Sequence, residues 1–305
     1  MRRLGIIGLE TTHGFIYPAL MNGYDPERLV ANSIPMVSGI FPTKGAPSVE
    51  GVQIVACYDP DPERARLVAE ACLIERVCSS AADVLKDVDG VLICNGDSRA
   101  HRGLATLTLE AGVPTFLDKP FTESIEDAEA LIALSESRNT PLFCTSALRF
   151  GPQVVALRER LPETVGELVT AHAIGTGDWD AYAIHTLETL LTVWGSGIRE
   201  IQSIGAIGHD TIQMTDRSGR RLIWQVCIDM AWIFHISVYG SKGMDQAFIP
   251  RSDRYVLFKG AAERISTFMH TRETPVPLRD TLELVRILDL ARANRGTMMP
   301  VDVAG

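Results

Sequence analysis

The stretch GIIGLETTHGF, residues 5–15, decides the fold of the N-terminal half of this chain. An apolar run over residues 4–9 leads into Gly8 and later Gly14, as a strand does when a glycine-rich turn and a helix follow it. Turns with the pattern G-x-G-x-x-G bind a dinucleotide, because the backbone and the helix N-terminus face its pyrophosphate. Glu10 occupies the position of the second glycine, so the turn keeps the pattern only in part.

Several side chains at this strand end are candidate cofactor ligands. Thr11 and Thr12 offer hydroxyls and backbone amides at a helix N-terminus, where phosphate oxygens bind. The carboxylate of Glu10 repels a pyrophosphate unless it turns away or pairs with a cation. The expected cofactor-binding residues are Gly8, Glu10, Thr11, Thr12, His13, Asp59, Asn95 and His101.

Short β-type runs alternate with helical patterns through residues 1–150. One helix is marked by Asp61 as N-cap with a proline after it, and another by the capping box of Ser124 and Asp127. This alternation predicts an α/β fold with a doubly wound parallel sheet of the Rossmann type, whose ligand site lies beyond the carboxyl ends of the strands. The expected strands are 4–9, 52–58, 90–95, 113–120 and 140–148.

Residues 24–50 interrupt the alternation with an insertion that is rich in proline and glycine and has no clear period. A connection of this length is often functional. It places Asp59 much further from Gly8 than the roughly 20 residues usual for the acid that binds a ribose. Asp59 either binds that ribose or only caps the next helix; since no arginine follows it directly, NAD is preferred to NADP.

Residues 151–305 are expected to form a second α/β domain, for the substrate and for oligomerisation. Helices are expected over 154–161 and 180–194, and a last helix over 278–293 that packs back on the body of the chain. Consecutive strands without helices between them predict an open, mostly antiparallel sheet. The expected β segments are 166–177, 198–206, 210–216, 220–229, 232–240 and 254–260.

These strands carry apolar residues on both alternations, which predicts that a homo-oligomer buries the open face of the sheet. An irregular cover from the C-terminal segment is the alternative. A net charge of −9 argues against nucleic acid as a partner. The six cysteines show no C-x-x-C spacing and no apolar run reaches about 18 residues, so we expect free thiols, no membrane partner and a cytoplasmic location.

Taken together, four segments resemble the Gfo/Idh/MocA oxidoreductase family. HRGLATLTLEAGVPTFLDKPFTES, residues 101–124, resembles its His-led helix, AG turn, strand and E-K-P motif. ALRFGP (147–152) looks like its domain-junction segment, AYAIHTLETLLTVWG (181–195) like its substrate-domain helix, and VYGSKG (238–243) like a later strand end. The order and spacing of the four carry the resemblance over nearly the whole chain.

The resemblance implies NAD(P)-dependent oxidation or reduction of a sugar, a polyol or a related carbonyl compound. It implies that Lys119 orients the substrate hydroxyl and that His185 accepts its proton, which suits an imidazole near neutral pH. The small, sugar-like substrate is expected to meet Arg149, Asp178, Trp179, Asp180 and Tyr182.

The chain departs from the family pattern at Ala181, which stands where the family has an aspartate four residues before His185. If an acidic partner is needed, Asp180 or Glu188 must reach the imidazole. Glu10, the insertion and Ala181 favour an alternative, a relative that has lost nicotinamide redox chemistry and acts as a ligand-binding or regulatory protein, or as a non-redox enzyme. No metal is expected, because the spacing of His172, Asp178 and His185 matches no standard site.

Overall fold

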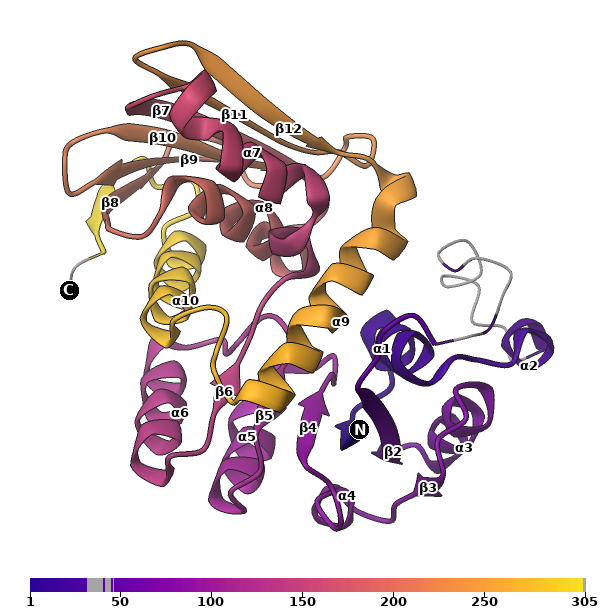
Figure 1. Ribbon diagram of the computed structural model, residues 1–305. Coiled ribbons are helices and arrows are strands. Elements are labelled where there is room, and N and C mark those ends of the chain that lie inside the picture. Colours follow the sequence, from indigo (N-terminus) through magenta and orange to yellow (C-terminus); the bar gives the residue numbers. More distant parts are fainter. Residues whose placement is uncertain (32–40, 42–44, 46, 304–305) are drawn as a thin grey trace. The chain divides into compact units, whose positions relative to one another are not determined.

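The chain divides into two compact units in the computed structural model, which describes residues 1–31, 41, 45 and 47–303 (Figure 1). The first unit comprises Met1–Thr145 and Phe258–Leu278, and the second Ser146–Leu257 and Arg279–Gly305. The division therefore differs from the expected 1–150 and 151–305, because a later segment of the chain returns to the first unit. Residues 32–40, 42–44 and 46 of the insertion expected over 24–50 lie outside the described residues.

The first unit is built on six parallel strands in the order β3-β2-β1-β4-β5-β6. This confirms the predicted Rossmann-type sheet. Strand β1 pairs with both β2 and β4, so the direction of winding reverses there, and the carboxyl ends of β1 and β4 are where a doubly wound fold has its ligand crevice. The strands are β1 (Arg2–Ile7), β2 (Val52–Tyr58), β3 (Arg76–Val77), β4 (Gly90–Ile93), β5 (Thr115–Leu117) and β6 (Leu142–Phe143).

Side-chain caps begin α3 and α6 where the sequence predicts them. Asp61 accepts hydrogen bonds from the first-turn amides of α3, and Ser124 accepts one from the Asp127 amide at 3.1 Å. The described helices of this part of the chain are α1 (Thr12–Asn22), α2 (Pro26–Ala31), α3 (Pro62–Ala71), α4 (Ala81–Val84), α5 (His101–Glu110) and α6 (Ile125–Arg138).

The prediction of a strand over 254–260 is wrong, because these residues begin the long helix α9 (Arg254–Thr271). Ala261, Ile265 and Phe268 are fully buried at helical spacing, a period that a seven-residue window hides. Phe268 packs on Phe143 with ring centroids 5.5 Å apart, and Ser266 donates to the Glu50 carbonyl at 3.0 Å. These contacts explain why residues 258–278 belong to the first unit.

The second unit carries an open sheet in the order β12-β11-β7-β10-β9-β8-β13, antiparallel except where β7 meets β10. The mostly antiparallel sheet was predicted, whereas β12 and β13 were not. The strands are β7 (Leu168–Thr176), β8 (Ile198–Ser203), β9 (His209–Asp216), β10 (Arg221–Cys227), β11 (Phe234–Gly240), β12 (Met244–Ile249) and β13 (Pro300–Asp302). The helices are α7 (Pro152–Thr164), α8 (Trp179–Trp194) and α10 (Leu278–Ala293).

Helices α7 and α8 lie against one face of this sheet (Figure 1). Leu222, Trp224 and other alternate residues are buried on the covered face. The opposite alternation is polar at its centre, where His172 donates to Gln225 at 2.8 Å and Gln225 to Thr211 at 2.9 Å. The expectation of apolar residues on both alternations is therefore wrong at the centre of the sheet, where His172, Gln225 and Thr211 stand on the open alternation.

Candidate functional site

The glycine-rich turn lies at the crevice between β1 and β4. Gly8 adopts φ +85°, and a Cβ there would lie 2.4 Å from the backbone of Asn95, which follows β4. A Cβ on Gly14 would lie 2.6 Å from the Cα of Leu9, so this glycine provides the close packing of helix α1 on the turn. Two of the three glycine functions of a dinucleotide-binding turn are thus present.

Glu10 bridges the crevice itself. Its Oε1 accepts a hydrogen bond from the Gly96 amide at 2.5 Å, which joins the loop after β1 to the loop after β4. The Thr11 hydroxyl donates to the Cys94 carbonyl at 3.0 Å and caps α1 by accepting from the Gly14 amide at 3.3 Å. The carboxylate is therefore held on a backbone amide, and the Thr11 hydroxyl is used by the protein.

Asp59 and His101 are both held by contacts within the protein. The Asp59 carboxylate is fully buried and accepts from the amides of Leu9 and Asp61 at 2.7 and 2.8 Å, so it fixes the turn instead of facing a ribose. His101 is also fully buried, with Nδ1 2.9 Å from the Pro120 carbonyl oxygen. Both residues lie behind the turn, and the cap of the next helix, stated as the alternative for Asp59, is supplied by Asp61.

A buried His–Asp pair stands directly before Lys119. His13 Nδ1 lies 2.6 Å from Asp118 Oδ2, and the other oxygen of Asp118 is buried with no hydrogen-bond partner among the described residues. Burial raises the pKa of Asp118, but the charge and hydrogen bond of His13 and the charge of Lys119 outweigh it, so the pKa lies below its ordinary value. Phe258 packs edge-on against His13 at 4.9 Å.

This pair predicts a specific loss of stability in acid. Because the folded pKa of Asp118 lies below the unfolded value of about 3.9, its stabilising effect is complete above about pH 5 and is lost as the pH falls through the folded value. Asp118→Asn is expected to destabilise the chain by about 2 kcal/mol at pH 7 and to flatten the acid limb. Urea midpoints between pH 2.5 and 7 measure both effects.

Asp245→Asn is the matched control, because Asp245 pairs at 3.0 Å with the half-exposed Arg160. Removing that pair is expected to cost less than about 1 kcal/mol. Equal effects of the two substitutions at pH 7 would contradict the role given to the buried pair.

The second unit contributes a network around His185 on α8. His185 Nδ1 lies 2.6 Å from the Ser146 hydroxyl, and the Ser146 amide donates to Glu188 Oε2 at 2.7 Å. Arg149 Nη1 lies 3.6 Å from the other Glu188 oxygen, and the Tyr182 ring lies 5.9 Å from that of His185. Two of the expected substrate residues, Arg149 and Tyr182, thus lie beside the candidate acid–base group.

The three remaining residues expected at the substrate form a helix cap, a core contact and a surface ion pair. Asp178 caps α8 by accepting from the Ala181 amide at 2.9 Å. Trp179 is buried against Trp224, with ring centroids 4.9 Å apart, and so belongs to the core. Asp180 is exposed and pairs with Arg292 at 3.3 Å. The structure therefore does not place these three residues at the candidate substrate site.

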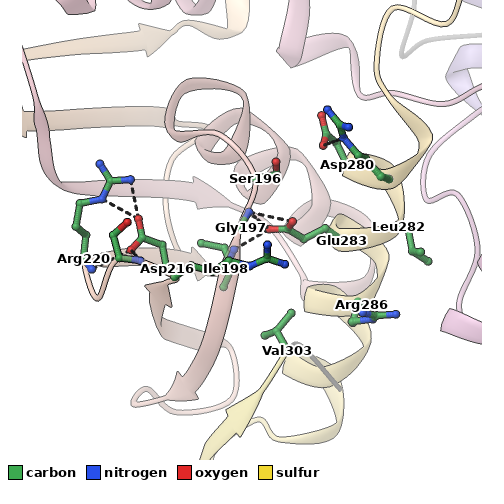
Figure 2. Close-up of a pocket in the computed structure, with 13 residues that line it drawn as sticks. Ser196, Gly197, Ile198, Asp216, Arg220, Asp280, Leu282, Glu283, Arg286 and Val303 are labelled. Atoms are coloured by element: carbon green, nitrogen blue, oxygen red, sulfur yellow. Dashed lines mark hydrogen bonds and ion pairs between the residues drawn. The ribbon is translucent and has the colours of Figure 1, made fainter.

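A pocket of about 530 Å³ in the second unit is separate from this network (Figure 2). It is lined by the turn after α8, the β9–β10 hairpin and α10. Glu283 accepts from the amides of Gly197 and Ile198, and Asp216 pairs with Arg220, so the acidic groups serve the protein's own donors (Figure 2). None of the expected site residues lines this pocket.

Two residues of the candidate site, Asp118 and Ser146, were not predicted from the sequence. Asp118 belongs to the D-K-P motif, but its contact with His13 depends on helix α1 reaching past β4, which no local pattern reveals. Ser146 precedes the ALRFGP segment, and it meets His185 only because η2 (Ala147–Phe150) packs beside α8. Within the described residues no group of three metal-ligating side chains is present, and no helix is long and apolar enough to cross a membrane.

Fold and site together define a two-unit α/β protein with a Rossmann-type ligand crevice. Residues 40–146 match a family model described as the oxidoreductase family GFO_IDH_MocA, with an NAD-binding Rossmann fold. This match supports the resemblance to the Gfo/Idh/MocA family that the motifs carry. The matched range begins after the turn that bears Glu10.

Among curated proteins, the chain is similar to D-apiose dehydrogenase of Paraburkholderia graminis, with 35% identity over 133 residues, 43% of this chain and 33% of the relative. It is also similar to the myo-inositol dehydrogenase Hyg17 of Streptomyces leeuwenhoekii, with 32% identity over 111 residues, 36% of this chain and 34% of the relative. The chain thus spans about a third of the length of these relatives.

A solved scyllo-inositol dehydrogenase of Lactobacillus casei with bound NAD(H) and scyllo-inositol has the same fold. Its TM-score is 0.81, at 14% identity over 100% of both chains. A probable dehydrogenase of Thermotoga maritima gives a TM-score of 0.81, at 16% identity over 99% of each chain. At these identities the likeness establishes the fold and nothing further.

Proposed function

We propose that the chain is an NAD-dependent dehydrogenase or reductase of a sugar, a polyol or a related hydroxy or carbonyl compound. The observation that carries the proposal is Lys119, a half-buried lysine directly after β5 and beside the crevice-lining strand β4. Apart from the charge of Asp118, its amine has no hydrogen bond or ion pair within the part of the chain that the structure describes. An amine in that state is available to a substrate oxygen.

The residues at the crevice fit NAD in all but one position. Gly8 and Gly14 leave the space that a side chain would fill, and Asn95 Oδ1 is a buried acceptor without a partner among the described residues. The amides of Thr12 and His13 open helix α1, where a pyrophosphate would be held. Bound NAD would supply the hydride acceptor.

The chain's own residues would handle the substrate hydroxyl and its proton. Lys119 would orient the hydroxyl and favour alkoxide character on its oxygen through positive charge. His185 would accept the proton while the hydride leaves the carbon, so the alcohol loses one proton and one hydride and becomes a carbonyl. Arg149 and Tyr182 would contact the rest of the substrate.

Calorimetric titration with NAD, and absorbance at 340 nm with a panel of polyols and sugars, test the proposal. Binding of NAD with turnover of at least one panel member is expected. The absence of both NAD binding and turnover would overturn the proposal.

The hydrogen bond of Glu10 to Gly96 favours a second candidate function. A protein that does not bind NAD could carry a carboxylate at this place in the turn. The chain would then be a ligand-binding protein or a non-redox enzyme. Binding of NAD with its nicotinamide beside Lys119 would exclude it.

Replacing Glu10 measures its effect on the cofactor directly. Glu10→Gly is expected to tighten NAD binding about tenfold, because it removes a negative charge near the pyrophosphate and releases the Gly96 amide. Glu10→Gln should give an intermediate affinity. Calorimetry measures both against Glu75→Gln, which removes an exposed charge paired with Arg3. Unchanged or weaker binding by Glu10→Gly would place Glu10 away from the pyrophosphate.

Association of copies through the open face of the second sheet stays a prediction. Tyr239, Met244 and Phe248 are exposed on β11 and β12, which supports an apolar contact at that end of the face. The polar centre around Gln225 would have to pair across the contact or hold water.

A further inference from the structure

We propose that Ser146 is the positioning residue of His185, in the role that an acidic side chain would otherwise take. The proposal deepens the proposed function and rests on it for its catalytic meaning. Ser146 Oγ lies 2.6 Å from His185 Nδ1, at hydrogen-bonding distance. This contact fixes the orientation of the imidazole ring through Nδ1.

Ser146 is itself held in place by two further hydrogen bonds. Its amide donates to Glu188 Oε2 at 2.7 Å, and its hydroxyl accepts from the Leu148 amide at 3.3 Å as the N-cap of η2. Glu188 is 3% exposed and lies three residues after His185, on the same side of α8. The helix that carries the imidazole therefore also carries the carboxylate that fixes its partner.

Asp180 and Glu188 are the acidic residues that the sequence offered as partners of His185, and each has other contacts. Asp180, one residue before the family position at Ala181, is exposed and pairs with Arg292. Glu188 binds the Ser146 amide and lies 3.6 Å from Arg149, so its charge is opposed by a guanidinium. Glu188, Arg149 and Tyr182 are among the charged and titratable groups of this network.

A hydroxyl partner has a different chemical effect from a carboxylate partner. A carboxylate only accepts, so it holds the proton on Nδ1 and stabilises the imidazolium by its charge. A serine hydroxyl accepts or donates, so it keeps the ring oriented whether Nδ1 is protonated or not, and it adds no full charge. Ser146 therefore suits a group that gives and takes a proton in both directions of a reversible redox reaction.

The first test needs no turnover. Two-bond proton–nitrogen spectra of the ¹⁵N-labelled full chain report which ring nitrogen is hydrogen-bonded, with His185 assigned from His185→Gln. In the native chain Nδ1 is expected to show the shift of a hydrogen-bonded nitrogen, and Ser146→Ala should remove it. Ser146→Thr should restore the native signal. A native Nδ1 without a hydrogen bond would overturn the proposal, even if Ser146→Ala failed to fold.

Kinetics give the second test. Ser146→Ala is expected to lower kcat about tenfold with KM within about twofold, and Ser146→Thr to recover most of the loss. Ser146→Asp should move the acid limb of the kcat profile to higher pH, because it places a charge beside the imidazole. Ser218→Ala, in an exposed hairpin turn, is the control.

The two proposals fail separately. Loss of NAD binding and of all turnover would remove the proposed function while the spectra still reported on Ser146 and His185. Unchanged spectra and unchanged kcat in Ser146→Ala, with NAD binding intact, would remove only the role of Ser146.

Discussion

Replacing Lys119 with methionine is expected to lower kcat about 10³-fold while the Kd for NAD changes by less than about threefold. Methionine keeps most of the volume of the lysine side chain and removes its positive charge. The substrate hydroxyl then loses the group that orients it and stabilises its alkoxide. Asp118 precedes this lysine and is locked to His13 at 2.6 Å, which fixes the backbone from which Lys119 extends.

Stopped assays at saturating NAD and substrate measure the loss, and calorimetry measures the retained cofactor binding. Lys86→Met is the matched control, because Lys86 is exposed and its pairing with Asp83 at 2.6 Å is a surface contact. A Lys119→Met chain with more than about a tenth of the native kcat would show that the amine does not act in the reaction.

Gly8→Ala is expected to destabilise the first unit by about 3 kcal/mol or more and to abolish NAD binding. The Cβ would lie 2.4 Å from the backbone of Asn95, and the residue keeps φ +85°, which an L side chain rarely adopts. The loops after β1 and β4 would have to separate, although their contact forms the crevice.

Gly112→Ala separates the two causes. Gly112 has φ +73°, but nothing lies within 4 Å of its added Cβ, so only the backbone strain of about 1 kcal/mol is expected. Urea unfolding and NAD titration of both variants make the comparison. If Gly8→Ala were as stable as Gly112→Ala, the close approach of the two loops would be contradicted.

The alternation of strand and helix signals predicted the parallel sheet because each element carries its own local code. The proline after Asp61 and the capping box of Ser124 mark helix starts whatever the rest of the chain does. The same reasoning failed at 254–260, where Tyr255 and Leu257 alternate over a short window while the helical period needs the next two turns to appear.

The site was less accessible to sequence reasoning because its contacts are not local. Glu10 was expected to repel a pyrophosphate unless it turned away or paired with a cation. Its partner is the Gly96 amide, which lies in the loop after β4. Asp59 and His101 stand at the predicted strand ends, but burial turns both into supports of the turn. Residue type and chain position suggested a role for each, while exposure decides whether a ligand can reach it.

The partner of His185 illustrates the same limit. Ala181 removes the acid that the motif would provide, and sequence spacing offered only Asp180 and Glu188 as substitutes. The hydroxyl of Ser146 comes from 39 residues earlier in the chain. A small polar residue at a helix start gives no sign of such a contact.

A crystal structure of the full chain soaked in NAD tests the central claim most directly. We expect a pyrophosphate at the N-terminus of α1, the Glu10 carboxylate turned onto the Gly96 amide, and a nicotinamide beside Lys119. A crevice that stays empty at saturating NAD, or a nicotinamide bound away from Lys119, would contradict it.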